Sequence, residues 1–220
     1  MLTQENNLTV ISIPSAFKMV GIIAGTWALL VVLSSTLAYL PGHPDFSLFT
    51  TYLSDIGDTA GWPQILFNSG TLMAAPMRYL VVVLLVLRLL QLGAGRAFAV
   101  AALIIGLIST AGTVFMTAVP FSVSPAIHKS GIPLYFLGVV VLQTLIGIRE
   151  WSLRNVPKIL PVLCFLMVSV YFIFATLVIL HEQGTVGRST PVIWEWLAFF
   201  SSVAWVFAQS ILLGGKEAAR

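Results

Sequence analysis

Residues 159–180 read ILPVLCFLMVSVYFIFATLVIL, a run of 22 residues without a charged side chain. A helix needs about 20 predominantly apolar residues to cross the hydrocarbon core of a bilayer, so this run is long enough to span a membrane. Of the 220 residues, 58% are hydrophobic and 9% are charged, against about 25% charged in soluble domains. A water-soluble fold of this size could not bury so much apolar surface. The sequence therefore predicts an integral membrane protein.

Five further apolar segments of similar length occur outside this run, joined mostly by short connections. A transmembrane barrel would show alternating segments of about ten residues, and none appear. We predict an all-α, polytopic bundle of six transmembrane helices in one domain, 16–213, between an N-terminal tail, 1–15, and a C-terminal tail, 214–220. The predicted spans are Ala16–Leu40, Pro63–Leu90, Ala97–Val119, Gly131–Ile148, Ile159–Leu180 and Pro191–Leu213.

The distribution of basic residues predicts the orientation of these spans. With six spans, both termini lie on one side, and eight Lys and Arg residues are expected there, against three on or near the other side. Cytoplasmic loops carry the excess of basic residues, so we predict cytoplasmic N- and C-termini. The eight are Lys18, Arg88, Arg96, Arg149, Arg154, Lys158, Lys216 and Arg220, and the three are Arg78, Lys129 and Arg188.

The composition of the loops narrows the classes of partner that this protein could bind. No loop combines basic and aromatic residues into a patch suited to nucleic acid, so nucleic-acid binding is not expected. Membrane lipids are the expected partners. Gly21 and Gly25 form a GxxxG pattern in the first span, which permits close helix approach. The pattern serves either packing within the chain, which we favour, or a helix of a partner.

Rare polar side chains gather on the predicted outer side. Arg78 lies well inside the second span, and Glu195 lies about one turn inside the last. Charges at membrane depth cost several kcal/mol unless they are paired or hydrated, so both should face the bundle interior. The others lie in outer loops or at outer span ends: His43, Asp45, Asp55, Asp58, His128, His181 and Glu182.

We expect Asp55, Arg78, His128 and Glu195 to form one connected cluster, in which an acid neutralises Arg78. Such a cluster could line an outward-facing pocket for a lipid headgroup, an ion or a substrate. Alternatively, the same pairs could serve only to hold the outer helix ends together. Three histidines and a carboxylate would suffice for a catalytic zinc site. The histidine spacings match no HExxH-type motif, however, and we predict neither a metal nor a cofactor.

Several short motifs resemble those of one membrane-protein family. Tyr52–Asp58, followed by Trp62-Pro63-Gln64 and Phe67, resembles the "ISDTG…PE…F" signature of the damage-regulated autophagy modulator (DRAM)/FRAG/Sfk family, whose members share the CWH-type N-terminal domain. The stretch His128-Lys129-Ser130-Gly131, with Phe136 and Gln143, is similar to that family's "H..GA…F…Q", and Trp194-Glu195-Trp196 to its "EW". The sequence departs from the family pattern in one residue and one segment: Gln64 replaces its glutamate, and Val119-Pro120-Phe121 replaces its Asn-Phe-Gln segment.

The resemblance implies a lipid-linked role, since relatives act in autophagy and lysosomal membranes, in plasma-membrane lipid organisation or in remodelling of GPI lipids. We therefore expect a non-catalytic protein of the plasma membrane or an endomembrane that binds or organises lipid through the outer pocket. One alternative is a metal-assisted lipid hydrolase or lipid-remodelling enzyme that uses His128 and Asp55. A second alternative is a small transporter. The expected ligand-binding residues are Ser54, Asp55, Asp58, Arg78, His128 and Glu195.

Overall fold

The computed structural model describes residues 12–119 and 123–215, and this part of the chain is helical, without strands. Six of its helices are long and apolar enough to cross a membrane, as the sequence predicts. The elements are α1 (Ile13–Tyr39), η1 (Leu40–Gly42), α2 (Leu53–Asp58), α3 (Trp62–Gln91), α4 (Arg96–Ala118), α5 (Pro125–Ser152), α6 (Ile159–Glu182) and α7 (Ser189–Gly214).

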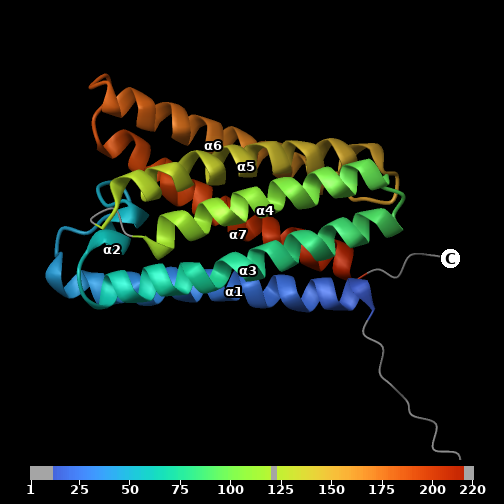
Figure 1. Cartoon of the computed structure of the whole chain (residues 1–220), viewed down its shortest axis with the longest axis horizontal. Coiled ribbons are helices and arrows are strands. Elements are labelled where there is room, and N and C mark those ends of the chain that lie inside the picture. Colours follow the sequence, from blue (N-terminus) through green and yellow to red (C-terminus); the bar gives the residue numbers. More distant parts are fainter. Residues whose placement is uncertain (1–11, 120–122, 216–220) are drawn as a thin grey trace, which may run out of the picture.

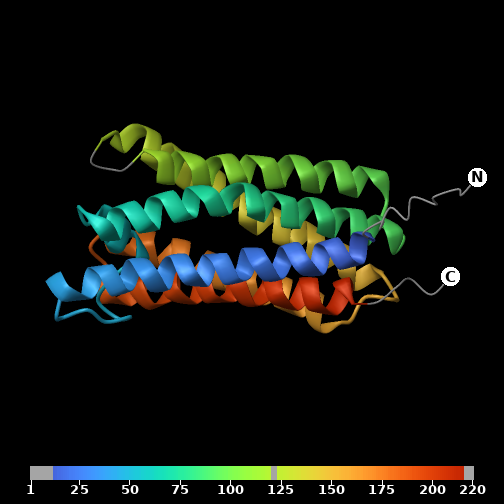
Figure 2. The ribbon, with the colours of Figure 1, turned by 90° about the horizontal axis from the view of Figure 1, so that it is seen from below.

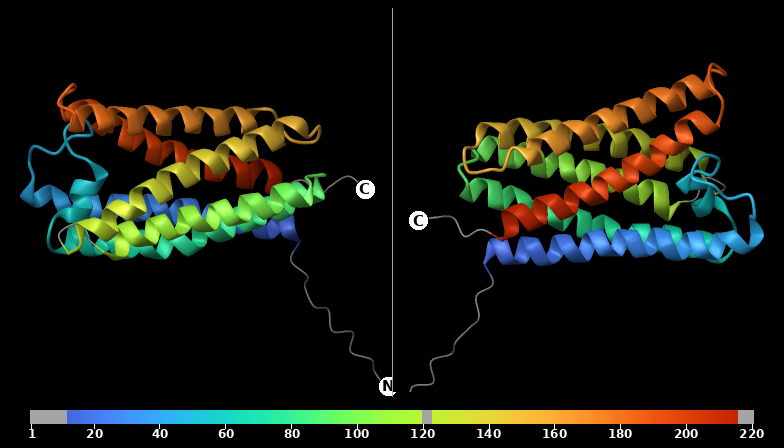
Figure 3. Two further views of the ribbon diagram at one scale, coloured as in Figure 1. Left: turned by 45° about the horizontal axis from the view of Figure 1, so that its top comes forward. Right: turned by 180° about the vertical axis from the view of Figure 1, so that it is seen from behind.

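The six long helices form a ring in which each packs against two neighbours. The order around the ring is α1, α3, α4, α5, α6 and α7, and α7 returns to α1. The bundle is elongated, with the start of α1 and the end of α7 at one end, here called the termini end (Figure 2). The short helix α2 lies at the opposite end, here called the α2 end (Figures 1 and 3). An even number of spans explains why the start of α1 and the end of α7 lie on one side.

Local signals in the sequence fix where the long helices begin and end. α1 begins after Ser12, whose side chain accepts a hydrogen bond from the Ser15 backbone N–H at 3.4 Å. α3 begins after Gly61, whose φ of 102° is a conformation that glycine adopts without strain. Pro63 occupies the first turn of α3, where backbone N–H groups have no partner within the helix, so the missing N–H of proline costs no hydrogen bond.

The fourth span begins earlier than the sequence analysis predicts. α5 starts at Pro125 rather than Gly131 and ends at Ser152 rather than Ile148. A proline in the first turn favours a helix start at that point. The prediction followed hydropathy, which is low in the polar turns at a helix end even though those turns are still helical. Consequently, His128 and Glu150 both lie on the helix.

Two packed regions hold the ring together. Towards the termini end, fully buried Val81, Leu85, Leu89, Ile146 and Leu160 belong to the main apolar core. At the α2 end, a smaller cluster joins α1, α2 and α7. The outward faces of the helices carry many exposed apolar side chains, which suits contact with lipid tails rather than water.

Small residues allow the closest helix contacts. Gly21 and Gly25 are buried where α1 packs on α7, against Ser210 and Phe207 respectively. A Cβ on Gly25 would lie 2.8 Å from the Phe207 ring. The GxxxG pattern is therefore used in packing within this chain.

Candidate functional site

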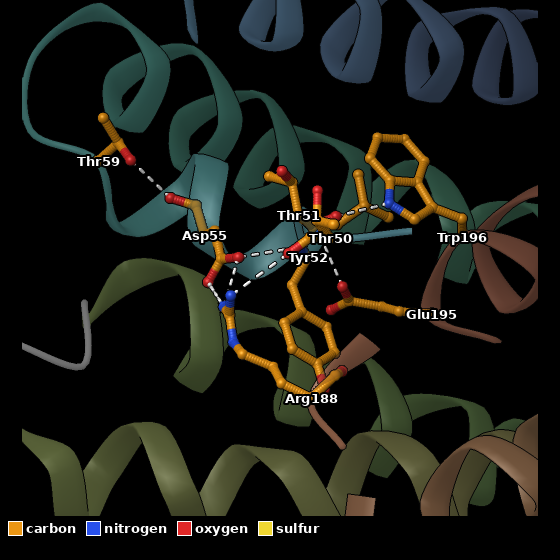
Figure 4. Close-up of polar contacts among 9 residues, drawn as sticks. Thr50, Thr51, Tyr52, Asp55, Thr59, Arg188, Glu195 and Trp196 are labelled. Atoms are coloured by element: carbon orange, nitrogen blue, oxygen red, sulfur yellow. Dashed lines mark hydrogen bonds and ion pairs between the residues drawn. The ribbon is translucent and has the colours of Figure 1, made fainter. Parts of the chain in front are cut away.

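The short helix α2 is fastened to the start of α7 by an ion pair. Both carboxylate oxygens of Asp55 accept hydrogen bonds from Arg188 Nη2, at 2.7 and 2.6 Å (Figure 4). The guanidinium also lies over the Tyr52 ring, 5.0 Å from its centroid. Burial raises the pKa of the Tyr52 phenol, with a smaller contribution from the Glu195 carboxylate. The phenol thus keeps its proton at neutral pH and donates to the Arg188 carbonyl at 3.3 Å.

Further contacts fix α2 on the two helices beside it. Glu195 Oε2 accepts a hydrogen bond from the Leu53 backbone N–H at 2.6 Å, and Trp196 Nε1 donates to the Thr51 carbonyl at 2.9 Å (Figure 4). On the other side, Asn68 Nδ2 of α3 donates to the Gly57 carbonyl at 3.0 Å. Both the first residues and the last turn of α2 are therefore held in place.

A cavity of about 470 Å³ lies inside the ring beneath α2, and all seven α-helices contribute to its wall. Its volume lies within the range of pockets that hold drug-sized ligands. Ser54 and Asp58 line this cavity and are also exposed at the surface, so its mouth lies beside α2. Much of the wall is apolar and includes four phenylalanines: Phe67, Phe136, Phe174 and Phe199.

Arg78 projects into the cavity from α3 and is half-buried. Its guanidinium lies over the Tyr135 ring, 4.8 Å from the centroid, and Nη2 donates to Ser109 Oγ at 3.3 Å. Ser109 lies nine residues before the end of α4 at Ala118, or about 14 Å down the helix at 1.5 Å per residue. Arg78 is therefore held close to the middle of the membrane-spanning region.

The predicted pairing of Arg78 with an acid is wrong. Within the described residues, Arg78 makes no ion pair, because Asp55 binds Arg188 and Glu195 binds the backbone of α2. The prediction treated Arg188 as a loop charge, but the docking of α2 on α7 brings it to Asp55. An aromatic ring and a hydroxyl stabilise the Arg78 guanidinium instead, and neither neutralises its charge.

Five of the six predicted site residues nevertheless line the same cavity. Ser54, Asp58, Arg78, His128 and Glu195 do so, whereas Asp55 lies outside it. His128 comes from the first turn of α5, and its Nδ1 lies 3.3 Å from the Val119 carbonyl oxygen. The cluster expected from the sequence is therefore a set of groups around one cavity, not one bonded network.

Sequence reasoning missed a hydroxyl chain on the cavity wall. The Tyr135 and Tyr171 hydroxyl oxygens are 2.9 Å apart, and Tyr171 lies 2.7 Å from Ser202 Oγ. All three residues stand within apolar runs of different helices, where a tyrosine or serine resembles ordinary span composition. The one signal in the sequence was that these hydroxyl groups lie within membrane spans, where water is absent and a hydroxyl needs a partner in the protein.

A second polar cluster, also missed, lies towards the termini end between α5, α6 and α7. The Glu150 side chain is fully buried, and Cys164 Sγ donates to its Oε2 at 3.5 Å. Trp205 Nε1 in turn donates to Cys164 Sγ at 3.1 Å. The predicted span ended at Ile148, which placed Glu150 outside the membrane, so the sequence analysis did not predict it as a buried charge.

Among residues 12–119 and 123–215, no three His, Cys, Asp or Glu side chains come close enough together to hold a metal ion. Comparisons with protein-family models, with curated proteins and with solved structures find no match for this chain.

Proposed function

We propose that this multi-pass membrane protein binds a single-chain, anionic amphiphile of the membrane in the cavity beneath α2. The observation that carries the proposal is the environment of Arg78. It is the one Lys or Arg among the described residues that line the cavity, and no carboxylate neutralises it there. Intramembrane charges that face a cavity are by default candidates for ligand binding, since an unpaired charge at that depth is costly.

The remaining wall supports an elongated ligand. Apolar side chains form much of the wall, while Ser54, Asp58 and Asn68 add polar groups on or beside α2. An amphiphile with its anionic end at Arg78 and its chain among the phenylalanines would match this lining. The volume of about 470 Å³ favours one chain over the two chains of a bilayer phospholipid. A role in membrane lipid homeostasis, as the resemblance to the DRAM/FRAG/Sfk family implies, would act through this site.

Lipid extraction from the purified protein, followed by mass spectrometry, tests the proposal. We expect a single-chain anion at near-stoichiometric amount with the wild type. In Arg78→Gln its amount should fall at least about tenfold, because a hydrogen bond to a charged group contributes about 1.5–3 kcal/mol. Arg154→Gln, which removes an exposed charge at the termini end, is the matched control and should retain the ligand. Equal amounts in wild type and Arg78→Gln would contradict the proposal.

Transport of the same anion is a second candidate, favoured by the depth of Arg78. A guanidinium about 14 Å below the α2 end lies deeper than a lipid headgroup normally does. Uptake of the extracted anion into proteoliposomes, abolished by Arg78→Gln, would favour transport over binding alone.

A further inference from the structure

A smaller recess of about 50 Å³ adjoins the cavity at Arg78. Arg78, Tyr135, Tyr171 and Ser202 line both spaces, and the recess continues past them to Gln143 and Trp205. A site needs about 10–15 Å³ of such space for each water molecule, so the recess has room for a group of a few heavy atoms. It is thus an extension of the cavity with room for one small polar group.

Gln143 is the group in the recess that lacks a partner. The residue is 3% exposed, and its Oε1 atom accepts no hydrogen bond from the described residues. Buried polar groups are nearly always hydrogen-bonded, and an unpartnered one destabilises the fold. An amide carries an acceptor at one end and a donor at the other. The unpartnered Oε1 atom therefore needs a donor, which a small group that carries an O–H or N–H would supply.

The recess also presents a cation and hydroxyls. Arg78 supplies fixed positive charge, and the Tyr135, Tyr171 and Ser202 hydroxyls are joined at 2.9 and 2.7 Å. Ser202 Oγ donates to the Ala198 carbonyl at 2.7 Å, so Tyr171 donates to Ser202 and Tyr135 donates to Tyr171. The hydroxyls therefore offer a ligand their acceptor lone pairs. The recess therefore suits an oxyanion that also carries a proton.

We propose that the recess binds a phosphate monoester group as its monoanion, with the anionic oxygens at Arg78 and the P–OH at Gln143. This inference rests on the proposed function and names the headgroup of its ligand. A phosphate monoester loses its second proton near pH 6 in water, and a low-dielectric site favours the less charged form. A carboxylate, a sulfate ester or a phosphate diester would meet Arg78 equally but has no O–H for Gln143.

The phosphate could belong to a single-chain lipid or to a free phosphate compound that enters from the mouth. Four probes separate these sources and chemistries: decyl phosphate, decyl sulfate, decanoate and inorganic phosphate. Their affinities can be measured by isothermal titration calorimetry with the whole protein in lipid nanodiscs. The two decyl esters have the same chain and charge sign, so they differ at the proton-bearing oxygen that the inference invokes.

We expect decyl phosphate to bind wild-type protein about tenfold more tightly than decyl sulfate, the effect of one hydrogen bond to a buried partner. In Gln143→Leu this preference should vanish, while decyl sulfate binding stays as in the wild type. Gln143→Met is a second variant in case leucine prevents folding. Gln183→Leu, at the exposed end of α6, should keep the tenfold preference.

Equal affinity of wild-type protein for the two esters, or a preference that survives in Gln143→Leu, would overturn the inference and leave the recess filled by water. Binding of decanoate and both esters in that case would still support the proposed function. Binding of none of the decyl probes would contradict the proposed function itself. Inorganic phosphate that binds as tightly as decyl phosphate, and depends on Gln143, would support the recess while assigning its ligand to a free phosphate compound.

Discussion

Asp55 and Arg188 lie 133 residues apart in the sequence, and their ion pair joins α2 to α7. Their side chains are 31% and 53% exposed, so solvent screens the pair, and exposed ion pairs contribute about 0–1 kcal/mol. Because the carboxylate is engaged by both oxygens, we expect a coupling of about 0.5–1 kcal/mol between Asp55→Asn and Arg188→Gln. The free energy of unfolding in sodium dodecyl sulfate, measured for the double-mutant cycle, checks this.

The same cycle with Asp45→Asn in place of Asp55→Asn is the control, since Asp45 is an exposed acid in the same connection that does not bind Arg188. It should show no coupling. A coupling near zero in the Asp55 cycle as well would mean that the ion pair does not hold α2.

Individual residues also mark how far the sequence could predict the site. Arg78 and Glu195 could be placed inside the bundle, since a charge on a span cannot face lipid cheaply. The partner of Asp55 could not be predicted, because it depends on how α2 lies against α7. The burial of Glu150 was not predicted for another reason. Hydropathy does not locate the last turn of a helix, and Glu150 lies two positions beyond the predicted end of its span.

At the scale of elements, the α1–α7 contact leaves no room for a side chain at Gly21. A Cβ there would overlap Ser210. We expect Gly21→Ala to lower the free energy of unfolding by about 1–3 kcal/mol, the usual effect of overpacking. In an uncrowded helix, alanine would instead stabilise by about 1 kcal/mol relative to glycine, so the sign is diagnostic. Unfolding in sodium dodecyl sulfate measures the change.

Gly42→Ala is the matched substitution, because a Cβ on Gly42 meets no atom within 4 Å. Its effect should stay within about 0.5 kcal/mol of zero. If Gly21→Ala proves neutral or stabilising, α1 does not pack on α7 as closely as described. The existence of both helices followed from the sequence by length and hydropathy, whereas their contact did not, since GxxxG names no partner helix.

At the scale of the whole molecule, the excess of basic residues at the termini end predicts that this end faces the cytoplasm. The native Cys164 is fully buried, so background labelling should be low. We expect a membrane-impermeant maleimide to label Ala60→Cys, beside α2, on intact cells. Ser152→Cys, exposed at the termini end, should react only after permeabilisation. The reverse pattern would invert the orientation and place the mouth of the cavity on the cytoplasmic side.

The contacts of α2 with the last helix also determine when α2 can dock during synthesis of the chain. A ribosome adds about 5–20 residues per second, so the 133 residues from Asp55 to Arg188 take roughly 7 to 27 s to make. During that interval the α2 segment has emerged but its anchors on α7 have not. Nascent chains stalled before residue 188 should be cut by protease near α2, and longer ones should resist. Resistance of the shorter chains would mean that the contact with Asn68 of α3 is enough to dock α2. Until α7 is synthesised, a ligand could reach the nascent cavity by a route that the finished protein closes.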